Sequence, residues 1–339
     1  MAEKGLTIDY SCLTPTTEIR ILTLEHGRGD DSIICTLRPV TRDGAEYHAL
    51  SYEWEDESKN DPFITVDGRH VQIRMNLYDA LKNIRKPTED QRLWVDAICI
   101  NQSDVKEKSQ QVAMMGEIFT NAVGVISWLG PDRDDSNLAM DLLSHDIVRD
   151  FFRKDSPEMT AIFALCHRRY WRRVWIIQEL YLAKSYVIWC GHKSIPERRF
   201  QRSLDDLVWP NYAYRSAFLD SPASLHSLAR LRRSTEPYDL IQWLYVCIIG
   251  DFQCTREQDI IYALLSISTD YKKAKGTFTV DYSKAPRDIF LELLCQRNLS
   301  TWCRGHEGLW LGLAEKMKLN IDEDLRRNIS KEPPYMDIC

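Results

Sequence analysis

The sequence predicts an α/β protein in which a parallel sheet is flanked by helices, with β-hairpins before the sheet and a helical extension after it. β-like runs separated by glycine-containing turns dominate the first part of the chain. From residue 47 to residue 129 strands alternate with amphipathic helices, which is typical of a parallel sheet covered on both faces. Beyond about residue 195 the apolar spacing is helical. We therefore expect a β entry segment over residues 1–45, an α/β domain over 46–192, and a mostly helical extension over 193–339 that packs on the core.

Two hairpins are expected near the N-terminus. The runs 20–24 and 33–37 are rich in isoleucine and leucine, and a turn-prone segment containing two glycines separates them. The runs 63–66 and 70–73 flank Asp67-Gly68-Arg69, the kind of tight connection that a hairpin needs. Between the two hairpins, residues 47–54 read as a further strand.

A helix, a strand, a second helix and a third strand are expected next. Asn76 is a plausible N-cap for a helix that carries Leu77, Ala80, Leu81 and Ile84 on one face. The run LWVDAICINQ, residues 93–102, reads as a buried strand, and Ser103-Asp104 with Glu107 would then cap a helix. That helix leads into an apolar strand over residues 124–129.

The remaining elements are expected to be mainly helical. The run 186–190 is a candidate strand that returns to the sheet. The expected helices cover 138–143, 159–166, the tryptophan-rich run 168–183, 225–231, 240–249, 260–267 and 289–294.

Composition limits the classes of partner. The chain has 44 basic and 50 acidic residues among 339, so its charge gives no reason to expect nucleic acid as a partner. Residues 1–13 contain no apolar core of signal-peptide length, and no stretch is apolar over the length of a membrane span. We therefore expect a cytoplasmic protein. The ten cysteines form no CxxC pair, which favours reduced thiols and predicts no metal site.

Polar residues at the expected strand ends suggest a site. Ligands of parallel sheets bind beyond the carboxyl ends of the strands. One strand ends in Ser51-Tyr52-Glu53-Trp54, and the next carries Asp96, an unusual charge in an apolar run, before Asn101-Gln102. Structural roles remain open: Asp96 could accept backbone hydrogen bonds, and Asn101-Gln102 could be turn or cap residues.

The tryptophan-rich run offers a second carboxylate. On one continuous helix Trp171, Trp175 and Glu179 would be spaced four apart on one face, which would put the carboxylate beside two indoles. Burial against aromatic surface changes the basicity of an acid, and indoles can stack on planar substrates. The competing interpretation is that both tryptophans belong to the core.

Five segments of this sequence, taken together, resemble the fungal heterokaryon-incompatibility (HET) domain. Two further segments, Arg256–Ile267 and Thr279–Lys284, resemble stretches that commonly follow that domain, so the likeness covers about residues 45–285. The five segments are Ala49–Trp54, Val66–Leu81, Leu93–Gln102, Lys108–Gly130 and Arg168–Ala183.

The resemblance implies a fold, a role and a site. HET domains are cell-death effectors of fungal non-self recognition and are thought to be remote relatives of Toll/interleukin-1 receptor (TIR) domains, which are flavodoxin-like and of which many cleave NAD. The run from Trp175 to Leu180 is similar to the motif that holds the catalytic glutamate of TIR domains, and this implies that Glu179 is catalytic. NAD would be a substrate, and no resident cofactor is expected. The implied substrate-binding residues are Ser51, Tyr52, Trp54, Asp96, Ala97, Asn101, Gln102 and Trp175.

Alternatives to an NAD-cleaving effector stay open. The same surface could serve a non-enzymatic, oligomerising signalling module, or the chain could have been recruited to small-molecule metabolism. Glu55 stands where the HET pattern usually has glycine, and the expected tryptophan- and proline-rich segment near the end is absent. The implied partners are other copies of the chain and a NOD-like receptor or another incompatibility protein.

Overall fold

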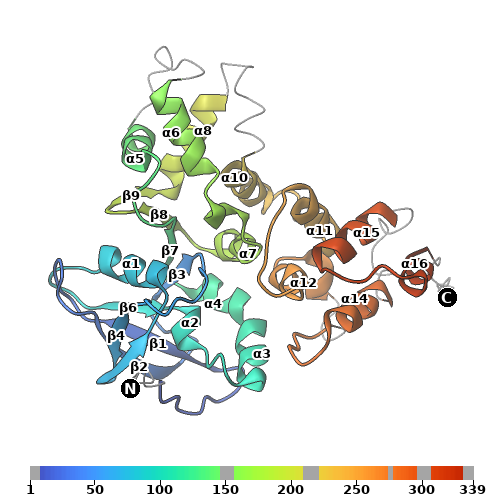
Figure 1. The fold of residues 1–339 in the computed structure, drawn as a ribbon, viewed down its shortest axis with the longest axis horizontal. Coiled ribbons are helices and arrows are strands. Elements are labelled where there is room, and N and C mark those ends of the chain that lie inside the picture. The colour runs from blue at the N-terminus through green and yellow to red at the C-terminus, as the bar shows by residue number, and fades with distance from the viewer. Residues whose placement is uncertain (1–7, 146–155, 209–220, 274–277, 296–306, 331–339) are drawn as a thin grey trace.

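The computed structural model describes residues 8–145, 156–208, 221–273, 278–295 and 307–330. Within these residues a nine-stranded mixed sheet has the strand order β5-β4-β2-β1-β6-β3-β7-β8-β9. Helices lie around the sheet, and a further group of helices extends from one side of it (Figure 1). The α/β class expected from the sequence is confirmed.

The two N-terminal hairpins are confirmed. Strands β1 (Glu18–Leu24) and β2 (Ile34–Thr41) pair antiparallel, as do β4 (Phe63–Val66) and β5 (Arg69–Gln72). The turn residues Asp67 and Gly68 have φ angles of 50° and 77°, the positive values that a type I′ hairpin turn requires.

Four parallel strands form the half of the sheet that matters for the site. They are β3 (His48–Tyr52), β6 (Gln91–Trp94), β7 (Gly124–Trp128) and β8 (Tyr186–Cys190). In chain order these strands are the first to the fourth, so the sheet order β6-β3-β7-β8 is 2-1-3-4, the beginning of the flavodoxin-like order. Strand β9 (Lys193–Pro196), which the sequence did not suggest, pairs antiparallel with β8.

The prediction of one strand over residues 93–102 is wrong from Val95 onward. Strand β6 ends at Trp94, and helix α2 (Asp96–Cys99) follows. The amides of Ile98 and Cys99 both donate to the carbonyl of Val95, which closes the helical turn. A short apolar run does not distinguish a buried strand from a buried helix, because both hide every side chain.

Asn76 does not cap a helix. Helix α1 (Met75–Ile84) begins one residue earlier, and Asn76 lies inside it. Its side-chain amide donates to the carbonyl of Glu53 at 2.7 Å and accepts a hydrogen bond from the indole of Trp128 at 2.8 Å. Asn76 therefore ties α1 to the ends of β3 and β7.

The helix capped by Asp104 is confirmed, although it is interrupted. The Asp104 carboxylate accepts hydrogen bonds from the amides of Lys106 and Glu107 at the start of α3 (Val105–Ala113). The chain bends at Met114 into a separate helix, α4 (Met115–Asn121). The next helices are α5 (Ser136–Ser144), α6 (Pro157–Cys166) and α8 (Glu197–Val208).

The tryptophan-rich run is not one helix, so Trp171 does not share a face with Trp175 and Glu179. A 3₁₀ turn, η2 (Arg169–Arg172), precedes helix α7 (Trp175–Leu182). Between them Arg173 is extended and forms a parallel β-bridge with Gln253. This pairing with a segment 80 positions later interrupts the helix, and no pattern in the neighbouring sequence predicts it.

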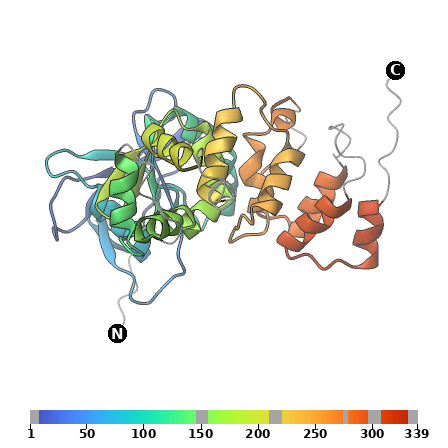
Figure 2. The same cartoon turned by 90° about the horizontal axis from the view of Figure 1, so that it is seen from above.

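The C-terminal helices build a second core. The first core is centred on the sheet; the second contains residues of α7 and of the later helices, and Trp175 and Tyr282 pack against both. Figure 2 shows the later helices extending away from the sheet. None of the helices in the described ranges is both long and apolar enough to cross a bilayer. The helices are α10 (Pro222–Arg232), α11 (Leu240–Ile249), α12 (Asp259–Leu265), α13 (Thr269–Lys273), α14 (Pro286–Cys295), α15 (Glu307–Lys316) and α16 (Glu323–Ser330).

Candidate functional site

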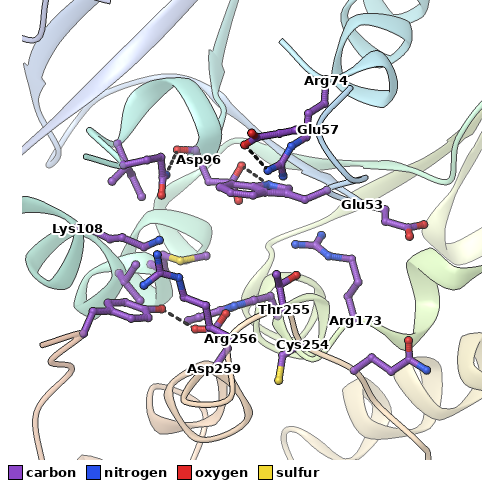
Figure 3. Close-up of a pocket in the computed structure, with 18 of the residues that line it drawn as sticks. Glu53, Glu57, Arg74, Asp96, Lys108, Arg173, Cys254, Thr255, Arg256 and Asp259 are labelled. Atoms are coloured by element: carbon purple, nitrogen blue, oxygen red, sulfur yellow. Dashed lines mark hydrogen bonds and ion pairs between the residues drawn. The ribbon is translucent and has the colours of Figure 1, made fainter. Parts of the chain in front are cut away.

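The candidate site lies beyond the carboxyl ends of the parallel strands. In the order 2-1-3-4 the chain leaves β3 toward one neighbour, β6, and later returns to the other, β7, so a crevice opens where the direction of winding changes. A cavity of about 470 Å³ there has walls from the segments after β3 and β6, from α3 and α7, and from the chain after the Gln253 bridge. Figure 3 shows charged side chains pointing toward its middle from several elements.

Asp96 lies in the wall of this cavity. It is the first residue of α2, and its carboxylate accepts hydrogen bonds from the indole of Trp54 at 3.1 Å and from the amide of Ala97 at 2.7 Å. Burial raises the pKa of Asp96, and the Arg173 guanidinium opposes that rise. The unusual charge in the apolar run is thus both hydrogen-bonded and exposed to the cavity.

Asn101 and Gln102, which follow α2, have different roles. The side chain of Gln102 lines the cavity and donates to the carbonyl of Asp96 at 3.0 Å. The backbone N–H of Asn101 instead donates to the Glu107 carboxylate at 2.8 Å, and Glu107 pairs with the buried guanidinium of Arg20 at 2.6 Å. Asn101 therefore holds the turn between α2 and α3 and does not face the cavity.

Glu179 lies in a buried layer that we call the inner layer, made of Ser51, Tyr170 and Glu179. Only 2% of Glu179 is exposed, and its Oε2 atom has no hydrogen-bond partner among the described residues. The hydroxyls of Ser51 and Tyr170 hydrogen-bond to each other at 2.7 Å. None of these three residues lines the cavity.

The electrostatics of Glu179 connect it to the cavity wall. Burial raises the pKa of Glu179 to about 7, the Arg173 guanidinium and the Ser51 hydroxyl act against the rise, and the charge of Asp96 adds to it. Arg173 and Asp96 both line the cavity, and Arg173 also donates to the carbonyl of Tyr52. The carboxyl of Glu179 is thus electrostatically coupled to residues that a ligand would touch.

The predicted site residues are therefore only partly brought together. Four of the nine, namely Trp54, Asp96, Gln102 and Trp175, line the cavity. The other five, which lie outside its lining, are Ser51, Tyr52, Ala97, Asn101 and Glu179. Trp171 is a core residue with 1% exposure, as the structural interpretation of the tryptophans held.

Sequence reasoning missed most of the charged lining. Lys108 projects from α3, Arg173 from the bridge with Gln253, and Arg256, Asp259 and Tyr282 come from beyond residue 250. We call Lys108, Arg256 and Tyr282 the outer wall. The segments that contain Arg256, Asp259 and Tyr282 belong to the HET resemblance, and their polar residues within apolar surroundings were the available signal.

Two ion pairs and one tyrosine bond fix part of the lining. Arg74 pairs with Glu57 at 3.1 Å, and Arg169 pairs with Glu53 at 3.1 Å. At the outer wall the hydroxyl of Tyr282 donates to the carboxylate of Asp259 at 2.6 Å, and burial raises the pKa of Asp259. No cluster of metal-ligating side chains occurs within the described ranges.

This arrangement suits binding and polar chemistry on a ligand of moderate size. The cavity combines indole surfaces from Trp54 and Trp175 with cations and the carboxylate of Asp96. Because the pKa of Glu179 is about 7, its protonated and ionised forms coexist near neutral pH, which is a property of acid–base and electrostatic catalysts.

The sequence is similar to heterokaryon incompatibility proteins. Residues 47–179 match the family model described as heterokaryon incompatibility protein (HET). Heterokaryon incompatibility protein 6, OR allele, of Neurospora crassa is 28% identical over an alignment that covers 54% of this chain. The alignment covers 35% of the relative, so the chain spans about a third of its length. No solved structure matches. Residues 47–179, which contain β3, β6, β7 and Glu179, form a domain of the HET family.

Proposed function

We propose that this chain acts in fungal heterokaryon incompatibility and that its HET domain does so by hydrolysing NAD in the strand-end cavity. The family match and the name of the Neurospora relative support the role in incompatibility. The enzymatic part of the proposal rests on the site, and assembly into homo-oligomers with an incompatibility partner such as a NOD-like receptor belongs to the same proposal.

The observation that carries the enzymatic part is the coupling of Glu179, with its pKa near 7, to Asp96 and Arg173 at the carboxyl ends of the parallel strands. In the proposed reaction the bond between the nicotinamide nitrogen and C1′ of the ribose breaks. Both bonding electrons leave with nicotinamide, so no general acid is needed. Water then adds to C1′ and releases a proton, which gives ADP-ribose. A carboxylate stabilises the oxocarbenium-like ribose in between.

The two carboxyl groups have different positions in this reaction. Asp96 already lines the cavity, whereas Glu179 is buried next to the residues that do. The ribose therefore reaches Glu179 only if the ligand shifts part of the wall. Arg173 is the candidate for that shift, because it lines the cavity and also interacts with Glu179.

The test is nicotinamide release from NAD by the purified, concentrated protein. We expect Glu179→Gln to lower the rate by a factor of about 100 or more, as removal of a group that stabilises transition-state charge does. Glu158→Gln, at a partly exposed glutamate of α6 outside the cavity lining, is the matched control and should retain the wild-type rate. Absence of release from the wild-type protein, or equal release from Glu179→Gln, would reject the enzymatic proposal.

A second candidate function is a non-enzymatic signalling module. The burial of Glu179 outside the cavity lining favours it, because a buried carboxyl group can be purely structural. This candidate predicts that toxicity on expression survives Glu179→Gln. It also predicts that toxicity is lost when the exposed apolar residues Tyr245 and Ile249 of α11 are replaced by serine, since these are 57% and 65% exposed.

A further inference from the structure

Three cations of the cavity have no carboxylate partner. The lining contains five basic side chains, and two of them, Arg74 and Arg169, are paired with glutamates. Lys108, Arg173 and Arg256 form no ion pair with any carboxylate in the described part of the chain. Figure 3 shows Lys108 and Arg256 on one side of the cavity and Arg173 on the other, with all three extending toward its middle.

The fold holds two of these cations side by side. The Nζ atom of Lys108 lies 5.0 Å from the centroid of the Tyr282 ring, and the Cζ atom of Arg256 lies 5.3 Å from the same centroid. Contacts of this kind attract each cation to the ring. Burial and the charge of Arg256 lower the pKa of Lys108, and the charges of Asp259 and Asp96 act against this lowering.

The nearby carboxylates of Asp96 and Asp259 attract the three cations but form no ion pair with them. Asp96 is engaged by Trp54 and by the amide of Ala97, and Asp259 is engaged by the hydroxyl of Tyr282. Burial raises the pKa of both carboxyl groups, and the cations of the lining act against that rise. The adjacent cations Lys108 and Arg256 repel each other, and a bound anion would offset that repulsion.

We propose that Lys108, Arg173 and Arg256 form an anion subsite that binds the diphosphate of a nucleotide. A diphosphate presents oxygens on two sides, which matches cations that approach from opposite sides of the cavity. Trp54 and Trp175 in the same lining provide flat surfaces for a base. The volume of about 470 Å³ is within the range of small-molecule sites.

This subsite names the ligand class of the proposed function, and it also extends the site beyond the family match. Arg256 and Tyr282 lie outside residues 47–179, so the HET-matched segment alone lacks part of the subsite. The anion subsite depends on the proposed function only for the choice of a nucleotide as ligand. It is tested by measuring the binding of a nucleotide that does not react.

The experiment is isothermal titration of the full chain with ADP and, separately, with adenosine. ADP should bind and adenosine should bind at least about tenfold more weakly, because adenosine lacks the charged oxygens. Lys108→Met and Arg256→Gln should each weaken ADP binding by about tenfold, and increasing salt should weaken binding to the wild-type protein.

Two matched variants serve as controls. Lys106→Met removes an exposed lysine from the same helix as Lys108, outside the cavity lining, and should leave ADP binding unchanged. Arg169→Gln removes a lining cation that is already paired with Glu53, and should weaken binding by less than about threefold. Thermal melting of each variant shows that it is folded.

The proposal is overturned if wild-type protein fails to bind millimolar ADP, if adenosine binds as tightly as ADP, or if Lys108→Met and Arg256→Gln bind ADP like the Lys106→Met control. Failure of the NAD reaction gives a different result. Protein that binds ADP through these cations but releases no nicotinamide keeps the subsite and rejects only hydrolysis.

Discussion

The inner layer and the outer wall of the site differ in burial and in the part of the chain from which their residues come. Ser51, Tyr170 and Glu179 are each at most 2% exposed and lie within the HET match. Lys108 and Tyr282 are only partly buried and Arg256 is exposed, and the last two come from the chain beyond the match. The inner layer packs with the core of the sheet, whereas Tyr282 contacts both cores.

Because of this difference, we expect replacements in the inner layer to affect folding stability and replacements in the outer wall to affect ligand binding. A buried side chain is packed against its neighbours in the folded protein, so its replacement lowers the free energy of unfolding. A partly exposed cation without a carboxylate partner contributes little to folding and is free to meet a ligand.

The largest expected effect is that of Trp171→Ala. Trp171 is 1% exposed, its indole donates to the carbonyl of Leu165 at 3.0 Å, and its ring stacks on Phe200. Its loss should lower the free energy of unfolding by about 3–5 kcal/mol. The partly exposed Trp175 is the matched control, and Trp175→Ala should cost clearly less when both are measured by urea unfolding. An equal decrease in the free energy of unfolding for both variants would contradict the distinction between a core tryptophan and a cavity tryptophan.

Glu179→Gln should change how stability depends on pH. The pKa of Glu179 rises from 4.5 to about 7 on folding, so between these values the unfolded chain loses a proton that the folded chain keeps. The wild-type protein therefore loses stability as pH rises through this window, by about 3 kcal/mol in total, and the glutamine variant lacks this loss.

Urea unfolding at about pH 5 and about pH 8 measures this effect. The variant should gain stability relative to the wild-type protein at the higher pH, and Glu158→Gln on the surface should show no such gain. A difference between Glu179→Gln and wild type that is the same at both pH values would contradict the raised pKa of Glu179.

The smallest expected effect on folding is that of the outer wall. Lys108→Met and Arg256→Gln should each change the free energy of unfolding by no more than about 0.5 kcal/mol, because neither forms an ion pair within the described residues. Arg20→Met is the contrasting control. It removes a cation that is 1% exposed and paired with Glu107, so it should destabilise by about 3–5 kcal/mol. A comparable loss in all three variants would show that the outer wall is structural.

Local patterns in the sequence were sufficient for much of the fold. Alternating apolar residues with glycine turns identified both hairpins, and Asp104 was correctly assigned as a helix cap. The run after β6 and the tryptophan-rich run were assigned wrongly because the deciding contacts are distant. The Arg20 side chain reaches the end of α2, and Gln253 pairs with Arg173 where a continuous helix was expected.

The candidate site shows the same division. Trp54, Asp96 and Gln102 were predicted from polar or aromatic residues at expected strand ends, and Trp175 was predicted from the tryptophan-rich run. All four line the cavity. Lys108 and Arg256 looked like ordinary surface cations. Nothing local distinguishes a cation that lacks a partner from one that has a partner, because pairing depends on elements far apart in the chain.

The residue pattern is enough to assign the α/β class, the family of residues 47–179 and the carboxyl groups at the strand ends. Periodicity, turn residues and ordered motifs carry that information locally. The packed fold is needed to show that Asp96 faces the cavity while Glu179 lies behind its wall. It also brings together three cations that form no ion pair with a carboxylate in the described part of the chain. Burial and charge pairing are properties of the packed chain, since each depends on which distant segments pack around a side chain.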